Sequence, residues 1–181
     1  MTAWSQDRYI AAFCFAAEAH RDQTMTGSHL PYLWHISVVG MEVMAAVACD
    51  VGCDADLAVQ CAVLHDVVED TPVTLDQVRA RFGTAVAAGV SALSKDATLP
   101  HPARLADSLR RIREQPREVW MVKLADRITN LQPPPAQWSV EKVMAYRADA
   151  VMIHDQLHPA SGFLADRLAA KIATYGVLDL V

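Results

Sequence analysis

The stretch Leu64-His65-Asp66-Val67-Val68-Glu69-Asp70-Thr71 places a His-Asp pair four residues before a Glu-Asp pair. Residues four apart share one face of a helix, so we expect His65 beside Glu69 and Asp66 beside Asp70. The residues around them are apolar, which carries these polar groups into a buried setting. Three carboxylates and an imidazole buried together are unfavourable unless a positive charge compensates them, and a divalent cation is the usual solution. The pattern predicts a metal site on a buried helix, although either pair alone also occurs on exposed helices.

Two residues elsewhere in the chain, His35 and Asp126, are the further candidate ligands. Each is a polar residue next to or within an apolar, helix-like segment. Together with His65 and Asp66 they form a mixed nitrogen and oxygen set, which suits manganese, iron or zinc and lacks the thiolates of a structural zinc site. Taken singly, His35 reads as an ordinary core histidine and Asp126 as a salt-bridged carboxylate. Their order along the chain is what indicates a metal site.

The Glu-Asp pair supplies the candidate catalytic groups. A cation in such a site binds a water molecule and lowers its pKa. Glu69 and Asp70 follow the His-Asp pair by one turn, where they are placed to accept the proton of that water. Because crowded carboxylates titrate in competition, we expect at least one of them to have a raised pKa.

Composition fits one compact domain. The chain has 181 residues, of which 52% are hydrophobic, with no apolar run long enough to span a membrane. Residues 1–7 lack the features of a signal peptide, so we expect a cytoplasmic protein with no membrane partner. The net charge of −5 argues against nucleic acid as a partner. An anionic small molecule would have to be met by local cations.

The four cysteines, Cys14, Cys49, Cys53 and Cys61, lie in helix-like apolar contexts. The spacing of Cys49 and Cys53 permits a metal or disulfide reading, but no second thiol pair with histidines accompanies it. We expect buried free thiols, as is usual in the cytosol.

Apolar spacing throughout the chain predicts an all-α fold. The expected helices cover residues 5–22, 33–48, 54–69, 74–83, 84–94, 104–114, 118–131, 139–157 and 162–175. Pro72 is expected to end the helix that carries the His-Asp pair. Thr74 and Gln77 form a capping box that opens the next helix, which should stop at Gly83.

The ordered set His35, His65-Asp66, Asp126 resembles the HD superfamily of metal-dependent phosphohydrolases. The fuller pattern is similar to the small alarmone hydrolases and to the hydrolase domain of bifunctional stringent-response enzymes, from about Arg8 to about Leu157. The motifs that carry this likeness are Ala19-His20-Arg21-Asp22-Gln23, Pro31-Tyr32-x-x-His35, His65-Asp66-Val67-Val68-Glu69-Asp70-Thr71, Thr98-Leu99-Pro100 and Val122-Lys123-Leu124-Ala125-Asp126-Arg127-x-x-Asn130-Leu131.

The resemblance implies a compact HD-type helical bundle, with residues 1–181 as a single domain. It implies a Mn²⁺ cofactor and removal of the 3′-pyrophosphate of guanosine tetra- or pentaphosphate, giving GDP or GTP and pyrophosphate. It also implies roles in substrate binding for Asn130, near the ribose or fixing the site, and for Lys142 and Tyr146, near phosphate or sugar. Without the resemblance, these three are a helix-end amide, a solvated lysine and a half-buried tyrosine.

The chain departs from the family where relatives carry basic residues. Met25 lies where an arginine packs on the purine, and Ala97, His101 and Gln132 replace frequent lysines or arginines. Each lost cation removes a charge-assisted phosphate bond of about 1.5–3 kcal/mol. The basic residues that are candidates to compensate for these lost cations are Lys95, Arg104, Lys123 and Arg127.

Three readings stay open from the sequence. The first is a manganese-dependent hydrolase of guanosine alarmones. The second keeps the chemistry but changes the substrate to ppApp, the 2′-phosphate of NADPH or another nucleotide. The third is a degenerate member that binds a nucleotide or a partner protein without catalysis. The oligomeric state and the physiological role are not determined by the sequence.

Overall fold

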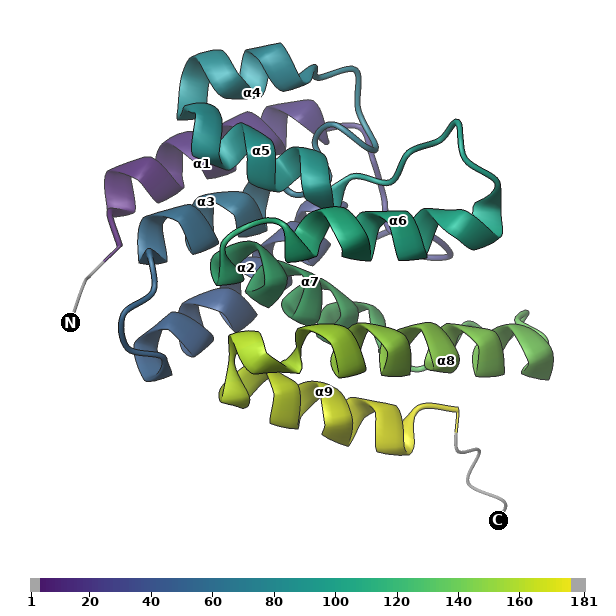
Figure 1. Cartoon of the computed structure of the whole chain (residues 1–181). Helices are drawn as coiled ribbons and strands as arrows, with labels where there is room; N and C mark the ends of the chain where they lie inside the picture. The colour runs from purple at the N-terminus through teal and green to yellow at the C-terminus, as the bar shows by residue number, and fades with distance from the viewer. Residues whose placement is uncertain (1–3, 177–181) are drawn as a thin grey trace.

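The computed structural model describes residues 4–176, in which helices are joined by loops without any β-strand (Figure 1). An isolated bridge pairs Thr24 with Pro31. The all-α prediction is confirmed, and the ends of the expected domain, residues 1–3 and 177–181, lie outside the described residues. The helices are α1 (Gln6–Ala19), α2 (Leu33–Cys49), α3 (Ala55–Leu64), α4 (Leu75–Phe82), α5 (Thr84–Leu93), α6 (His101–Arg113), α7 (Arg117–Asn130), α8 (Val140–Leu157), the short 3₁₀ helix η1 (His158–Ala160) and α9 (Gly162–Thr174).

Side-chain caps fix several helix starts at the residues that the sequence indicates. Ser5, Asp54 and Thr74 each accept a hydrogen bond from a backbone N–H of the first helical turn. Thr74 and Gln77 form the predicted capping box, and α4 ends at Gly83. Gly83 has a φ of 88°, which a residue without a side chain adopts at little cost and which lets the chain turn directly into α5.

The helix that precedes the His-Asp pair is shorter than predicted. α3 ends at Leu64, and residues 65–69 form turns rather than the expected helix, so Pro72 is not the residue that stops it. The amide of Val67 bonds to the carbonyl of Leu64, a tighter turn than an α-helix allows. The amide of Asp70 still bonds to the carbonyl of Asp66, at 2.9 Å, so the two residues stay one turn apart.

α6 begins earlier than expected, at His101 instead of residue 104. Pro102 lies in its first turn, where the missing N–H costs nothing because first-turn N–H groups have no partner within the helix. The Thr98-Leu99-Pro100 motif therefore forms the end of a loop that leads directly into α6.

The centre of the fold is formed by α2, α3 and α7, which pack on one another. Nearly every residue of α3 is buried, and α7 is buried from Glu118 to Thr129 apart from Trp120. In Figure 1, α1, α4 and α5 lie on one side of this centre and α8 and α9 on the other. A helix enclosed on all sides can carry polar groups only if they are paired, which makes the polar residues of α2 and α7 informative.

The cysteines are free, as predicted, but not all are buried. Cys53 and Cys61 are buried, whereas Cys14 and Cys49 are exposed on the outer faces of α1 and α2. Burial raises the pKa of the Cys61 thiol to about 12, which keeps it protonated and unreactive. In residues 4–176, no helix is both long enough and apolar enough to cross a bilayer.

Candidate metal centre and active site

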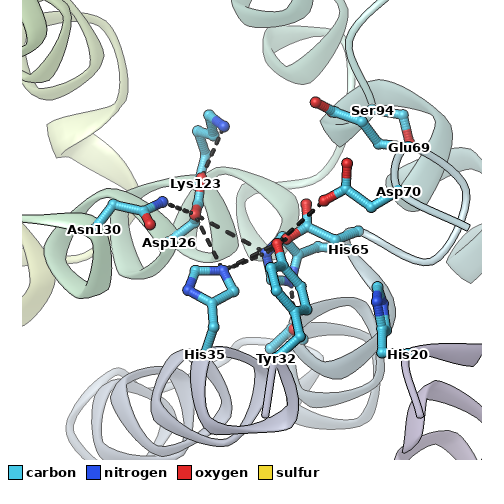
Figure 2. A network of polar contacts seen from close by, with 12 residues as sticks. His20, Tyr32, His35, His65, Glu69, Asp70, Ser94, Lys123, Asp126 and Asn130 are labelled. Carbon is cyan, nitrogen blue, oxygen red and sulfur yellow. Dashed lines mark hydrogen bonds and ion pairs between the residues drawn. The ribbon is translucent and has the colours of Figure 1, made fainter. Parts of the chain in front are cut away.

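The two predicted imidazoles and two predicted carboxylates meet where α2, the turn after α3 and α7 come together (Figure 2). The Nε2 atoms of His35 and His65 are 3.2 Å apart. Asp66 Oδ2 lies 2.9 Å from the Nε2 of His65 and 3.5 Å from that of His35. Asp126 Oδ1 lies 3.5 Å from His35 Nε2 and 3.9 Å from His65 Nε2. The donor atoms of His35, His65 and Asp126 all lie within 4.8 Å of one another, and Asp66 lies beside the two imidazoles.

These separations fit ligands of a single ion. Two atoms bound to one metal by bonds of about 2.1 Å lie roughly 3.0 Å apart at right angles and roughly 3.4 Å apart in a tetrahedron. Both imidazoles are almost fully buried, and the side chains of Asp66 and Asp126 are only 17% and 10% exposed. The donor set contains nitrogen and oxygen without sulfur, which suits a divalent cation of the manganese, iron or zinc type.

The hydrogen bond made by Nδ1 of His65 supports the use of its Nε2 as a metal ligand. Its Nδ1 donates to the carbonyl oxygen of Ala62 at 2.8 Å, which leaves the lone pair of Nε2 directed at the cluster. Burial disfavours a charged His65, but the attraction of Asp66 and Asp126 outweighs burial and raises the pKa of His65 to about 9. The two carboxylates thus favour a positive charge at this point, which a proton or a bound cation supplies.

Neighbouring side chains hold the two carboxylates in place. Lys123, itself buried, donates to Asp126 Oδ2 at 2.8 Å, and the amide of Asn130 donates to Asp126 Oδ1. Tyr32 donates its hydroxyl proton to Asp66 Oδ2 at 2.6 Å. Each carboxylate therefore reaches the cluster with a partner that fixes its orientation, as is common around metal ligands.

Glu69 and Asp70 lie at the edge of the cluster, on the side opposite Lys123 and Asn130 in Figure 2. Asp70 Oδ2 is 3.2 Å from the hydroxyl of Tyr32. Burial, together with the charges of Asp66 and Glu69, raises the pKa of Asp70 above the ordinary range of an aspartate. Glu69 instead accepts two hydrogen bonds from Lys95, one from its backbone N–H and one from its ammonium, each 2.8 Å long.

The three residues expected to bind substrate, Asn130, Lys142 and Tyr146, lie in two different parts of the structure. Asn130 is part of the cluster, because its amide binds Asp126. Lys142 and Tyr146 lie on α8, with Lys142 Nζ 4.2 Å from the ring centre of Trp138. The ring of Tyr146 packs edge-on against Trp138 and carries the guanidinium of Arg127 at 4.3 Å on its face. These side chains form a wall of two adjacent aromatic rings, Trp138 and Tyr146, with a cationic group against each ring.

Sequence reasoning gave no role to Tyr32 and did not foresee the contacts of Lys123 and Lys95. Tyr32 stands three residues before His35, so a helical turn at the start of α2 brings both side chains to the same face. Lys123 precedes Asp126 by three residues on α7 in the same way. This i, i+3 spacing is a signal visible in the sequence, whereas the contact between Lys95 and Glu69 depends on a loop.

Comparison with known proteins agrees with this geometry. A family model described as "HD domain" matches residues 12–157. The chain is 30% identical over 169 residues to a guanosine-3′,5′-bis(diphosphate) 3′-pyrophosphohydrolase MESH1 of Danio rerio, covering 90% of this chain and 91% of that protein. It is 34% identical over 143 residues to the MESH1 protein of Homo sapiens, covering 76% and 77% of the two chains.

A solved structure is similar over almost the whole chain. It is the structure of a metazoan ortholog of SpoT that is described as hydrolysing ppGpp and playing a role in starvation responses. The TM-score is 0.82 at 25% sequence identity, with 98% of this chain and all of that chain covered. The helical arrangement described above is therefore one that is known from experiment.

Proposed function

The chain belongs to the HD domain family, and from that premise we propose that it removes the 3′-pyrophosphate of guanosine tetra- and pentaphosphate. The products are GDP or GTP and pyrophosphate. The observation that carries this proposal is the meeting of donor atoms from His35, His65 and Asp126, with Asp66 beside the two imidazoles and Asp70 next to it. The relatives named as 3′-pyrophosphohydrolases, similar to this chain over most of its length, support the choice of substrate.

His35, His65, Asp66 and Asp126 are the residues that would hold a divalent cation, which we propose is manganese. When bound, such a cation supplies Lewis acidity that activates a water molecule and withdraws charge from a phosphoryl oxygen. The mixed imidazole and carboxylate donors favour manganese over magnesium, which prefers oxygen ligands, and over calcium. Lys123 and Asn130 keep Asp126 oriented for this role.

Asp70 is the proposed proton acceptor for the attacking water. Its carboxylate lies beside the cluster, and its raised pKa brings it closer to the pH at which a base is useful in catalysis. Tyr32 donates a hydrogen bond to Asp66 and approaches Asp70, which limits how far either carboxylate turns. Glu69, the second proposed catalytic carboxylate, acts next to Asp70 and orients the water once its contact with Lys95 loosens.

The nucleotide is proposed to lie between the cluster and the wall on α8. Asn130 has its amide nitrogen bound to Asp126, so its carbonyl oxygen is the atom left for a ribose hydroxyl. Lys142 and Tyr146 are proposed to contact phosphate or sugar at the outer edge. The packing of Tyr146 between Arg127 and Trp138 holds its ring in one orientation, which favours a defined contact with the substrate.

We further propose that residues 1–181 act as one HD-type domain on a free nucleotide in the cytoplasm. A chain with net charge −5 is poorly suited to a nucleic-acid backbone. The substrate is a small anion that a few local cations can neutralise, so no large basic face is required.

The test is phosphate and pyrophosphate release by manganese-loaded protein supplied with ppGpp, ppApp or NADPH. The matched control is Asp66→Ala, which removes one proposed ligand. Pyrophosphate released from ppGpp by the wild-type protein and not by the variant is the expected result. Elemental analysis of the metal content of both proteins shows whether the variant loses activity because it has lost the cation.

Two other results would overturn the proposed substrate. Faster turnover of ppApp or NADPH than of ppGpp would assign the same chemistry to another nucleotide, in line with Met25 standing where relatives carry an arginine. Absence of turnover on all three, in protein shown to hold the cation, would exclude this activity.

A further inference from the structure

The active site carries four carboxylates and receives a substrate that is itself highly anionic. Asp66, Glu69, Asp70 and Asp126 lie around one point, and a divalent cation offsets only part of their charge. Electrostatic repulsion would oppose substrate binding unless protein cations face the phosphates. The question is therefore which basic side chain of the protein is free to face the substrate phosphates.

The other three basic residues that are candidates to compensate the lost cations already contact other protein groups. Lys123 is 5% exposed and bound to Asp126. The guanidinium of Arg104 donates to the backbone carbonyls of Leu99 and Ala97, which holds the loop before α6. Arg127 is 6% exposed and its guanidinium lies on the face of the Tyr146 ring, while its Nε and Nη1 have no hydrogen-bond partner among the described residues. Lys123 and Arg127 are thus buried, and the half-buried Arg104 is tied to the loop by two hydrogen bonds.

Lys95 differs from these three in exposure and in the nature of its contact. Its side chain is 40% exposed, and its ammonium pairs with Glu69 Oε1 at 2.8 Å, at the edge of the cluster. Burial opposes its charge, yet attraction to Glu69, and more weakly to Asp126 and Asp66, raises the pKa of Lys95. The ammonium is thus fully charged and close to the proposed metal ligands. A partly exposed ion pair of this kind contributes little and is easily exchanged.

The backbone of Lys95 is fixed independently of its side chain. Its N–H donates to Glu69 Oε2 at 2.8 Å, so the residue stays beside Glu69 when the ammonium moves. The four-carbon side chain is flexible, and its compact charge binds phosphate as a point charge. An ammonium that leaves Glu69 for a phosphate also frees one oxygen of the Glu69 carboxylate for water.

We propose that Lys95 is a phosphate-binding residue of the active site, whose ammonium exchanges Glu69 for a substrate phosphate when the nucleotide binds. The inference rests on the proposed function and adds the residue that supplies the cation missing at Ala97. It also assigns a second role to Glu69, which is to bind the Lys95 ammonium while no nucleotide is bound.

The experiment compares Lys95→Met and Lys95→Arg with Lys171→Met. Lys171 lies on α9 outside the cluster, so its replacement changes the net charge equally without touching the site. Steady-state kinetics on ppGpp are measured for each, and ppGpp binding is measured by calorimetry in an Asp70→Asn background that does not turn substrate over. We expect Lys95→Met to raise KM and weaken binding by about tenfold or more, with partial recovery in Lys95→Arg.

The outcomes separate this inference from the proposed function. Hydrolysis of ppGpp with unchanged KM and unchanged binding in Lys95→Met would overturn the inference and leave the proposed function standing. A fall in kcat alone would also overturn it, because that result describes a residue that only positions Glu69. Absence of ppGpp hydrolysis in the wild-type protein, together with ppGpp binding that depends on Lys95, would support the inference while refuting the proposed function.

Discussion

The hydroxyl of Tyr32 lies 2.6 Å from Asp66 Oδ2 and 3.2 Å from Asp70 Oδ2, so it connects a proposed metal ligand to the proposed proton acceptor. Removing that hydroxyl leaves both carboxylates without a shared donor while the ring continues to pack against His20 and His35. We expect Tyr32→Phe to lower kcat about tenfold to a hundredfold, because hydrogen bonds to charged groups contribute about 1.5–3 kcal/mol.

The measurement is steady-state kinetics with the metal content determined in parallel. Tyr9→Phe, on α1 and packed against Phe13, is the matched control and should retain wild-type turnover. Equal kcat values for Tyr32→Phe and wild type would show that the hydroxyl does not contribute to the reaction.

The imidazole of His20 makes the stability of the fold depend on pH. Its Nδ1 donates to Gln23 Oε1 at 2.7 Å, its Nε2 is buried without a partner in residues 4–176, and burial lowers its pKa. Because the pKa of His20 is lower in the folded protein than in the unfolded chain, the unfolded chain binds a proton on His20 at a higher pH than the folded protein does. The contribution of neutral His20 to the free energy of unfolding is therefore fully present above the usual histidine pKa of about 6.5 and is lost as the pH falls below that value.

Urea denaturation of wild type and His20→Gln at pH 7.5 and pH 5.5 measures this effect. We expect the wild-type midpoint to fall more between the two pH values than the midpoint of the variant. Other titrating groups contribute to both proteins, so the difference between the two shifts reports on His20. Equal shifts would assign the pH dependence to other residues.

Gly89 on α5 leaves room for two neighbouring side chains. A Cβ at this position would lie 2.7 Å from Cys61 Sγ and 3.0 Å from Val119 Cγ2, both in the core. Although alanine is the better helix former by about 1 kcal/mol, we expect Gly89→Ala to destabilise the fold by about 1–3 kcal/mol through overpacking.

The double variant Gly89→Ala, Cys61→Ala checks the cause. Removing the sulfur relieves the closest contact, so the double variant should be more stable than the sum of the two single changes predicts. Additive free energies of unfolding would show that the sulfur is not the obstacle.

A bidentate ion pair connects α2 to α9. Arg167 donates from Nε and Nη2 to the carboxylate of Glu42, whose side chain is only 4% exposed. Arg167→Met leaves a buried carboxylate without its partner, and we expect a loss of about 2–3 kcal/mol in the free energy of unfolding because the arginine end is partly solvated.

Adding Glu42→Gln to Arg167→Met tests this reasoning. The neutral amide costs less to bury than an unpaired carboxylate, so the double variant should recover part of the lost stability. A double variant less stable than Arg167→Met would mean that Glu42 contributes through other contacts.

Much of the fold and of the candidate site was predictable because the signals are local. Apolar spacing locates the helices, and caps such as Thr74 with Gln77 fix where they begin. The order His35, His65-Asp66, Asp126 identified four side chains that the structure brings together. The i, i+3 partners Tyr32 and Lys123 were present in the same motifs, although their contacts were not recognised.

The parts that sequence reasoning missed depend on tertiary contacts. The end of α3 at Leu64 follows from the tight turn that presents His65 and Asp66 to α2 and α7, and helix periodicity carries no information about such a turn. The pairing of Glu69 with Lys95 joins residues 26 apart, with α4 and α5 between them along the chain. Which of Lys95, Arg104, Lys123 and Arg127 faces the site was likewise set by packing.

The four donor atoms come from segments that are distant along the chain. His35 and His65 are separated by 30 residues, and α7, which carries Asp126, comes after a still longer separation. Both intervening segments, which contain helices, have to fold back before the donor atoms meet. Each closure costs entropy, which the packing of the helices offsets. We therefore expect a chain that is truncated before α7, or that packs α2 wrongly, not to assemble the proposed metal site. If the proposed function holds, hydrolysis begins during synthesis only when α7 has docked, so incomplete chains would not act on the nucleotide.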